Sequence, residues 1–428
     1  MGNEQMTTRC QLSDARLPGM PNPVDIDVEE GRVVAIRSCS ARSTEADRWR
    51  PPAESSGSRI ESMDGMLLIP SLREHHSHLD KVLTADTIVN RTGDLMGAIG
   101  AWAKAENSGI LGLEEMQIRA ESAIERMLYS GVTSIRTHVN VGDSDPELRN
   151  LRAVAAARDR FRGVVDIEIV ALMQSPLTGP DGLGNRAALD RAVEFGIDFI
   201  GGCPHLEIDS PEAIKHLLDL AEAADLGIDL HMDESLDPDV LTVELLAREV
   251  LSRGCSQHVA ASHCVSLSVQ SEDRQRVIAA LLHSARITVV ALPQTNLFLQ
   301  GWKHPQSMPR GIAPLQLLAD HGVGIAAGGD NVQDPFNPMG RFDPLETASL
   351  LVTAAHLSPR DALRAVSADS TRWEDPERDL IGAPANFLAI DALNIREALA
   401  SAPMTRTTIR GGHIIATTKV ESRMISPG

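Results

Sequence analysis

The feature that most constrains this chain is a regular alternation, through its middle, of short apolar runs with longer amphipathic stretches. The apolar runs, each of a length suited to a buried strand, are Leu67–Pro70, Val132–Val139, Val165–Leu172, Phe199–Gly201, Gly227–His231, His258–Ser262, Ile287–Leu292 and Val323–Ala327. The intervening stretches include Glu147–Phe161, Ala187–Phe195, Ala213–Leu226, Asp239–Arg253 and Arg274–Ala285. Their apolar residues recur at three- and four-residue spacing, as in helices with one buried face. Strands alternating with helices in this way predict a closed parallel (β/α)8 TIM barrel.

Both ends of the chain are rich in predicted strands. Residues 24–38 form a hairpin pattern with a glycine turn, and the C-terminal end carries short strand-like runs between residues 386 and 417. Neither end has enough strands to bury a face alone, so the two are expected to combine into one small β-sandwich. This predicts three segments: 1–66 in the small domain, 67–375 in the barrel, and 376–428 completing the small domain. Residues 40–60, rich in Ser, Arg, Glu and Pro, are expected to form an exposed loop.

Composition excludes several classes of partner. Aromatic residues make up only 3% of the chain, which favours an aliphatic core and disfavours stacking platforms for single-stranded nucleic acid. Acidic residues number 59 against 40 basic ones, for a formal net charge of -19. A polyanion would be repelled by this charge, so no nucleic-acid partner is expected.

Cysteine usage and the absence of long apolar runs bear on location. The cysteines are odd in number and scattered, without a C-x-x-C pair: Cys10, Cys39, Cys203, Cys255 and Cys264. This pattern disfavours a disulfide framework and predicts a reducing cytoplasm. The first residues are polar and lack the apolar segment of a secretory signal. No apolar run approaches the roughly 20 residues that span a bilayer, so no membrane partner is expected.

The active site of a barrel lies at the carboxyl ends of its strands, so the polar residues after each apolar run are the candidates for chemistry. After the first run, His76 and His78 stand two residues apart. In an extended segment such side chains point to the same side and can bind one metal ion together. A lone histidine in a loop is more often simply solvated, but an alternating pair at a strand end favours a metal site.

Three later strand ends supply further candidates. His231 and Glu234 follow the fifth run, His263 follows the sixth, and Asp330 follows the eighth, after two glycines that let the backbone pass closely. Singly, Asp330 could be a helix cap and His263 a core histidine. Together, imidazoles and a carboxylate match a catalytic divalent site for Zn or Fe. No lysine lies near the fourth run, Ile197–Glu207, to bridge two ions, so one metal ion is expected.

An ordered series of motifs identifies a family. It comprises Pro70, His76-Ser77-His78-Leu79-Asp80, Arg136-Thr137-His138-Val139, Ile169-Val170-Ala171 with Gln174, Pro204-His205 with Glu207, His231 with Asp233-Glu234, Ala261-Ser262-His263, Asn296 with Leu299-Gln300-Gly301, and Asp330 with Asp334-Pro335. The series runs through nearly the whole chain and resembles the cytosine deaminase group of the amidohydrolase superfamily. A single His-x-His pair would be weak evidence, whereas the ordered series is specific.

The resemblance implies a role for each matching residue. It implies that His76, His78, His231 and Asp330 hold the metal ion. Glu234 would shuttle a proton to the substrate's ring nitrogen, and His263 and Asp330 would assist the attacking water. Gln174 would hydrogen-bond the substrate, while His138 would support the site, either as a substrate contact or packed behind it.

Departures from the group's pattern bear on the substrate. Asn331 follows Asp330 where the cytosine deaminases resemble one another in a second aspartate, and Phe336 stands where an indole is usual. Both positions resemble substrate contacts, so Asn331 argues against cytosine itself. Lys81, the Gln174-Ser175 pair and Asn331 resemble relatives that act on amino- or alkylamino-triazines, the N-isopropylammelide amidohydrolase type. Pterin, creatinine and isocytosine deaminases also belong to this neighbourhood.

These observations predict a hydrolase of carbon–nitrogen bonds other than peptide bonds. The expected reaction is metal-dependent deamination of a pyrimidine, pterin or triazine-type heterocycle, with release of ammonia. The alternatives are hydrolysis of a cyclic amide or an N-alkylamino-triazine and, in a different class, a non-catalytic ligand-binding barrel. A homo-oligomer is expected only by analogy with other barrels of this superfamily.

Overall fold

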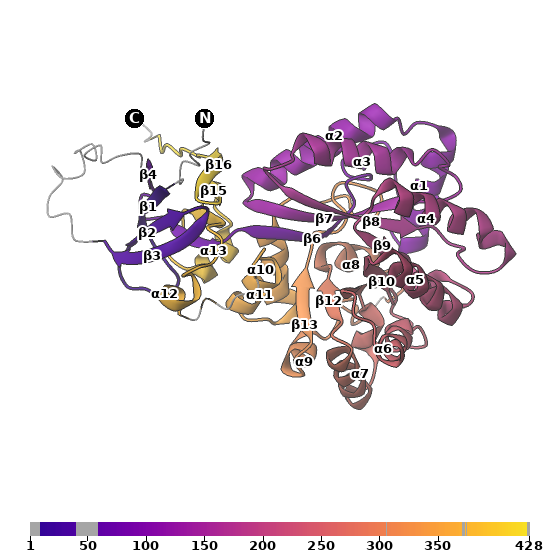
Figure 1. The fold of residues 1–428 in the computed structure, drawn as a ribbon. Coiled ribbons are helices and arrows are strands. Elements are labelled where there is room, and N and C mark those ends of the chain that lie inside the picture. The colour runs from indigo at the N-terminus through magenta and orange to yellow at the C-terminus, as the bar shows by residue number, and fades with distance from the viewer. Residues whose placement is uncertain (1–8, 40–58, 305, 370–372, 374, 426–428) are drawn as a thin grey trace. The chain divides into compact units, whose positions relative to one another are not determined.

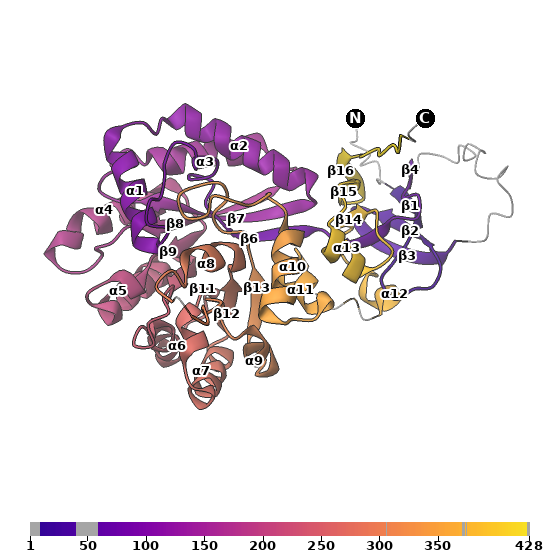
Figure 2. The same ribbon diagram turned by 180° about the vertical axis from the view of Figure 1, so that it is seen from behind.

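The computed structural model describes the chain except for residues 1–8, 40–58, 305, 370–372, 374 and 426–428. It divides into two compact units, and Figures 1 and 2 label their helices and strands. One unit comprises residues 74–126 and 134–366, and the other comprises residues 1–73, 127–133 and 367–428.

The larger unit is built on an eight-stranded sheet whose order follows the chain from β6 to β13. Its strands are β6 (Leu72–Ser77), β7 (Val132–Val141), β8 (Asp166–Met173), β9 (Phe199–Gly201), β10 (Gly227–Met232), β11 (Val259–His263), β12 (Thr288–Ala291) and β13 (Gly324–Ala327). Pairing from β7 through β13 is parallel. A parallel bridge between Ser77 and Asp330 brings the two edge strands together. The predicted (β/α)8 barrel is therefore confirmed.

Helices alternate with these strands along the chain (Figure 1). They are α1 (Leu95–Ser108), α2 (Leu113–Tyr129), α3 (Arg149–Arg160), α4 (Leu183–Phe195), α5 (Ser210–Ala224), α6 (Thr242–Arg253), α7 (Glu272–Ser284), α8 (Pro293–Leu299), α9 (Leu315–Asp320), α10 (Pro344–Ala355) and α11 (Pro359–Ala365). Short 3-10 turns lie at η2 (Pro180–Gly182), η3 (Pro204–Leu206) and η4 (Val265–Val269). The amphipathic stretches expected from the sequence correspond to α3 through α7.

Local sequence signals begin and end several of these helices. Asp94 caps α1 by accepting a hydrogen bond from the backbone N–H of Gly97, and Gly109 ends the helix in the left-handed conformation with φ 73°. Asp209 caps α5 in the same manner, and Ser271 caps α7. Such caps satisfy backbone donors that a helix leaves unpaired at its start. The helix after β6 therefore has defined ends, which matters for the cavity described below.

One strand prediction is wrong. The run Leu67–Pro70, expected to be the first barrel strand, is β5 and pairs antiparallel with β14 (Phe387–Ile390) in the smaller unit. The first barrel strand is the next segment, β6, in which Leu72 and Glu74 are buried and Arg73 and His75 are partly exposed. Several side chains of β6 belong to the site and do not pack in the core. The strand is therefore mostly polar and has no apolar run by which it could be predicted.

The smaller unit contains two four-stranded sheets drawn from both ends of the chain. One, in the order β3-β2-β1-β4, consists of β1 (Arg9–Ala15), β2 (Val24–Glu29), β3 (Arg32–Ser38) and β4 (Arg59–Ser62). The other, in the order β16-β15-β14-β5, adds β15 (Arg406–Arg410) and β16 (His413–Thr418). The short helix α12 (Pro376–Asp379) precedes β14, and α13 (Ile395–Ser401) lies between β14 and β15.

A single apolar cluster joins the two small sheets. It includes Leu12 and Ile26 from the first sheet and Leu68, Phe387 and Ile409 from the second, all without solvent exposure. Each sheet thus buries one face against the other, as expected for a sandwich. The prediction that both termini build one small β-structure is confirmed.

Some predicted features lie outside the described residues. Residues 40–58 of the expected exposed loop and residues 1–8 of the polar N-terminus belong to this part. Within the described residues, none of the helices combines the length and the apolar character that a bilayer crossing requires.

Candidate metal centre and active-site cavity

Strands β6, β10 and β13 deliver four side chains to one point. His76 lies on β6 and His78 directly follows it, His231 lies on β10, and Asp330 follows β13. Asp330 donates its backbone N–H to the carbonyl of His76 at 2.9 Å. Gly328 permits this approach, because a Cβ there would lie 2.7 Å from both the backbone nitrogen and oxygen of His76.

Glu74 links the ends of β6 and β13 through backbone hydrogen bonds. Its carboxylate accepts hydrogen bonds from the backbone N–H of His76 at 3.1 Å and of Gly329 at 3.0 and 3.1 Å. A buried carboxylate with several backbone donors is well satisfied, so Glu74 can hold the register of the two strand ends. The sequence search did not single out Glu74, although its place two residues before His76 puts it on the same face of the strand.

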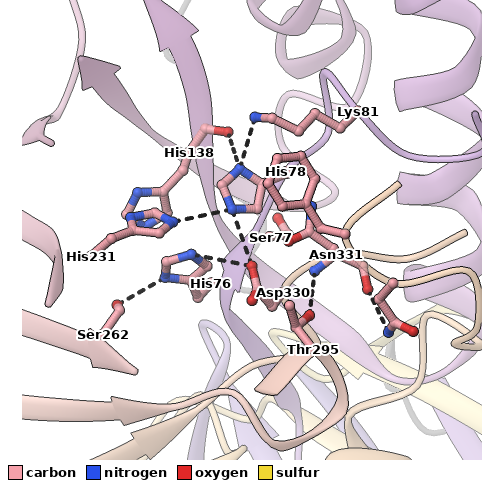
Figure 3. A network of polar contacts seen from close by, with 12 residues as sticks. His76, Ser77, His78, Lys81, His138, His231, Ser262, Thr295, Asp330 and Asn331 are labelled. Atoms are coloured by element: carbon pink, nitrogen blue, oxygen red, sulfur yellow. Dashed lines mark hydrogen bonds and ion pairs between the residues drawn. The ribbon is translucent and has the colours of Figure 1, made fainter. Parts of the chain in front are cut away.

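The four side chains form a compact, buried cluster, which Figure 3 shows in close-up. The candidate ligand atoms of His76, His78, His231 and Asp330 all lie within 4.8 Å of one another. Asp330 Oδ1 is 3.1 Å from His78 Nε2 and 3.5 Å from His76 Nε2, and the Nε2 atoms of His78 and His231 are 3.4 Å apart. Ligands at 2.0–2.1 Å from a tetrahedral ion are about 3.3 Å apart, so these separations suit one metal ion.

Unsatisfied polar atoms provide an independent test of that fit. Both carboxylate oxygens of Asp330 and Nε2 of His76 are buried and have no hydrogen-bond partner within the described chain. Buried polar atoms without partners are costly, and a bound cation would satisfy His76 Nε2 and one oxygen of Asp330, leaving the second oxygen as an acceptor beside it. The donor set therefore fits a divalent ion.

Burial also sets the protonation state of the imidazoles. It lowers the pKa of His76, His78 and His231 well below the ordinary value, with neighbouring histidines adding to the effect for His76 and His231, and Lys81 for His78. Neutral imidazole is the form that binds metals. The cluster is thus ready to bind an ion at neutral pH.

Groups behind the cluster select the ring nitrogen that faces it. His78 Nδ1 lies 3.1 Å from the backbone carbonyl of His138 and 3.2 Å from Lys81 Nζ, which itself donates to Asn140 Oδ1 at 2.8 Å. The carbonyl can only accept, so His78 Nδ1 carries the ring proton and donates to it when Nε2 binds the ion. His76 Nδ1 is 2.9 Å from Ser262 Oγ, and that hydroxyl lies 3.0 Å from Asp229 Oδ1. Because the hydroxyl has one proton and the carboxylate can only accept, Ser262 donates to Asp229 and accepts from His76. Both histidines therefore present Nε2 to the ion.

Asp229 is held in turn by a buried cation. Arg136 donates to Asp229 Oδ2 at 3.0 Å and to Glu168 at 2.9 Å. Burial raises the pKa of the Asp229 carboxyl, but the neighbouring His138 and then the Arg136 guanidinium outweigh it and hold the pKa below its usual range. His138 stacks on His76 with ring centroids 3.8 Å apart, and its Nε2 is 3.6 Å from Asp229. His138 is fully buried behind His76 and does not line the cavity.

A cavity of about 280 Å³ opens onto the cluster. Three of the four candidate ligands line it, as do the other predicted site residues Gln174, Glu234, His263, Asn331 and Phe336. The structure therefore brings together every predicted site residue, with His76 and His138 lying behind the cavity wall. Ligand pockets of about 300 Å³ and more are typical for small molecules, so this one suits one or two rings.

Glu234 and His263 lie side by side in the cavity. His263 Nδ1 is 3.6 Å from Glu234 Oε1 and 3.0 Å from the side-chain nitrogen of Asn296. An amide N–H can only donate, so His263 Nδ1 accepts and its ring proton resides on Nε2. Burial and the nearby Asp330 carboxylate raise the pKa of Glu234 well above its ordinary value, and burial lowers that of His263 to about 4. A carboxyl whose pKa shift favours its protonated form therefore lies beside an imidazole whose pKa shift favours its neutral form.

The cavity also contains residues that were not predicted as site residues. Lys81 Nζ donates to Asn140 Oδ1 at 2.8 Å and lies 5.5 Å from the centroid of the Trp102 ring. Glu106, Cys203 and His205 line the same space. The sequence singled out Lys81 only for its resemblance to triazine-acting relatives, and its place three residues after His78 also indicates a position at the site. The helix-borne residues Trp102 and Glu106 carry no sequence signal that separates them from an ordinary amphipathic helix.

A family model described as "Amidohydrolase family" matches residues 111–416. A pterin deaminase of Rhizobium rhizogenes is 31% identical over 365 residues, which cover 83% of this chain and 82% of the relative.

Two solved structures extend the likeness to nearly the whole chain. A 5-methylcytosine deaminase of Klebsiella pneumoniae, liganded with 5-fluorocytosine, has a TM-score of 0.83 at 28% identity and covers 97% of this chain and 99% of its own. An N-isopropylammelide isopropylaminohydrolase of Burkholderia multivorans has a TM-score of 0.77 at 26% identity and covers 96% and 98%. The chain belongs to the amidohydrolase family, and the predicted class, a hydrolase of carbon–nitrogen bonds, is confirmed.

Proposed function

We propose that this amidohydrolase removes an exocyclic amine from a planar nitrogen heterocycle by hydrolysis and releases ammonia. One observation carries the proposal: the carboxyl of Glu234 and the candidate metal cluster face the same small cavity. A ring bound there would meet a proton donor and the cluster together. A non-catalytic binding barrel has no use for a buried carboxyl poised in this way, so the arrangement favours an enzyme.

The cluster would hold one divalent ion, Zn or Fe, through His76, His78, His231 and Asp330. When bound, such an ion supplies a Lewis acid that makes water acidic enough to react near neutral pH. Asp330 would accept the proton of the attacking water at its second carboxylate oxygen. His263 would hold the reacting oxygen by donating from Nε2, because its Nδ1 already accepts from Asn296.

Glu234 would deliver protons to the substrate. Its raised pKa favours the protonated carboxyl, which suits a general acid. It would protonate the ring nitrogen beside the reacting carbon, regain a proton from the hydroxyl now bound to that carbon as the oxo group forms, and pass this proton to the departing amine. The proton that Asp330 accepted from the water would then restore the Glu234 carboxyl. Asn296 and Gln300 hold it in place, because Asn296 lies 3.5 Å from Oε1 and Gln300 donates to the Glu234 carbonyl at 3.3 Å.

Polar side chains around the cavity would orient the ring. Gln174 offers an amide with both donor and acceptor atoms. The Asn331 side chain donates to Asp334 at 2.7 Å, and this bond fixes the direction of its amide. Phe336 supplies an apolar surface in the same cavity. The pterin and 5-methylcytosine deaminases among the similar proteins support a pyrimidine or pterin ring.

A second candidate is release of an alkylamine from an N-alkylamino-triazine. The likeness to an N-isopropylammelide isopropylaminohydrolase favours it, and the same residues could carry the same proton transfers. Ring opening of a cyclic amide is less well supported. The described cavity has no lysine from β9 that could bridge two ions.

The test is a panel of aminopyrimidines, aminopterins, aminotriazines and creatinine, with ammonia and alkylamine measured separately and metal content measured in parallel. Ammonia release by the metal-loaded protein, lost on chelation and restored by Zn or Fe, is the expected result. Alkylamine release would establish the second candidate. Full metal content without release of either amine would overturn both.

Two further expectations accompany this proposal. A reducing cytoplasm, predicted from the scattered cysteines of the sequence, is the expected location. A small-molecule heterocycle as the sole partner, apart from assembly into a homo-oligomer, remains a prediction that size measurement in solution can check.

A further inference from the structure

Helix α1 forms one wall of the cavity. Leu95, Ile99, Trp102 and Glu106 follow one another at helical spacing, and all four line the cavity. Residues four, three and four apart share one face of a helix. This face therefore runs along the cavity as an apolar stripe that ends in one carboxylate.

Glu106 connects that wall to a predicted substrate contact. Glu106 Oε2 accepts a hydrogen bond from Gln174 Nε2 at 2.9 Å, and Oε1 accepts one from Asn150 Nδ2 at 3.2 Å. Ser144 donates to Gln174 Oε1 at 3.1 Å, so both ends of the Gln174 amide are fixed. Each Glu106 oxygen has two lone pairs and accepts one of these side-chain donors, so each retains acceptor capacity. Glu106 is half-buried, so a ligand in the cavity can reach it.

Trp102 gives the α1 wall of the cavity a flat aromatic surface that limits the shape of a bound ligand. Its side chain is buried at 3% exposure and packs in an apolar cluster to which Phe336 also belongs. Its indole N–H has no hydrogen-bond partner within the described chain. Two aromatic side chains in one cluster beside the cavity suit a planar ring and limit its orientation.

We infer that α1 determines substrate specificity, and that Glu106 accepts a hydrogen bond from a ring N–H of the heterocycle. The inference rests on the proposed function, since it concerns the substrate of the same site. It assigns the substrate to amino-heterocycles that carry a lactam-type N–H besides the amine that leaves. Carboxylates only accept hydrogen bonds, so a ring that presents lone pairs to Glu106 would be repelled. Such pairings discriminate strongly, because a missing donor leaves a desolvated carboxylate.

The test compares ring N–H compounds with their N-methyl counterparts in the metal-loaded protein. The probe pairs are pterin with 3-methylpterin and cytosine with 1-methylcytosine. Binding is measured by calorimetry in a Glu234→Gln background, so that turnover does not interfere. We expect the N–H compound of at least one pair to bind about 10- to 100-fold more tightly, the size of a hydrogen bond to a charged group.

Glu106→Gln is the decisive variant, because it keeps the size of the side chain and removes its charge. The preference for the N–H compound should fall by about tenfold, mainly through weaker binding of that compound. A purely steric penalty on the methyl group would survive this change and overturn the inference. The matched control, Glu114→Gln on the exposed start of α2, should leave the preference unchanged.

Two further results would also overturn the inference. If Glu106 acted only by orienting Gln174, Glu106→Gln would have no effect in a Gln174→Ala background. Failure of both N–H probes to bind would exclude the assigned class.

The binding test of Glu106 can be distinguished from the test of the proposed function, because the latter measures amine release by the protein with Glu234 intact. An N–H preference that depends on Glu106, without amine release, would reject the proposed function alone. Amine release without such a preference would reject the inference alone.

Discussion

The metal cluster and the α1 wall border the same cavity, but they are built in different ways. The four cluster residues lie at barrel strand ends and are between 0% and 6% exposed. Their neighbours hold them by hydrogen bonds from several strands. The α1 residues come from a segment inserted between β6 and α2, and Glu106 is only half-buried. The register of the barrel strands therefore positions the metal-binding residues, whereas the additional helix α1 would determine which heterocycle the cavity accepts.

Removing a cluster residue should produce the largest effect. In His231→Ala the ion loses one of four ligands, so metal affinity and amine release should fall together. The loss should exceed the about 100-fold that follows removal of a group behind a ligand. Metal content by mass spectrometry and turnover are the measurements. His413→Ala, at an exposed position on β16, is the control. Full metal with full activity in His231→Ala would reject the cluster as the metal site.

Changing Glu234 should separate chemistry from metal binding. Glu234→Gln keeps the shape of the side chain but cannot transfer a proton, so kcat should fall by about 10²- to 10⁴-fold while metal content is unchanged. Glu114→Gln, an exposed change of the same kind, should be neutral in both assays. Turnover near that of the unmodified protein would remove Glu234 from the reaction.

Replacing Ser262 tests whether the residues that hydrogen-bond to the ligands contribute to metal affinity. Ser262→Ala deletes the acceptor for His76 Nδ1 and the donor to Asp229, so metal affinity should fall by about 10- to 100-fold. At saturating metal, kcat should recover. Ser266→Ala is a matched control, because Ser266 is also buried and its hydroxyl has no hydrogen-bond partner among the described residues. Equal metal affinity in the two variants would contradict this role.

Replacing Asp334 should produce the smallest effect, a change in how the free energy of unfolding depends on pH. Burial raises its pKa to about 7, against hydrogen bonds from Asn331 and from the backbone of Phe336 and Asn337. The unfolded chain loses this proton near pH 4, whereas the folded chain keeps it until about pH 7. Stability contributed by Asp334 therefore falls as pH rises between these values and is constant above them.

The variant Asp334→Asn cannot titrate at this position. Relative to the unmodified protein, its free energy of unfolding should improve by about 2 kcal/mol between pH 5 and pH 8. Denaturant unfolding of both metal-free proteins at the two pH values measures this difference, and effects common to both cancel. A difference that does not change with pH would show that Asp334 ionises normally.

Much of the barrel was predictable because its elements have local signatures. Seven of the predicted apolar runs overlap β7 to β13, and the amphipathic stretches correspond to α3 to α7. The first strand was missed because Leu72–Ser77 carries Arg73, Glu74 and two histidines in place of an apolar run. A strand that serves a site at one end departs from the hydrophobic pattern by which strands are recognised.

The sequence by itself determined the alternation of strands and helices and the order in which chemically capable residues follow the strands. Those properties depend on neighbours in the chain, through side-chain periodicity and strand direction. Only the tertiary structure decided that Ser262 and Asp229 lie behind His76, and that Glu106 meets Gln174 across 68 positions of sequence. Such contacts arise when separate elements pack together, and no local pattern in the chain encodes their geometry.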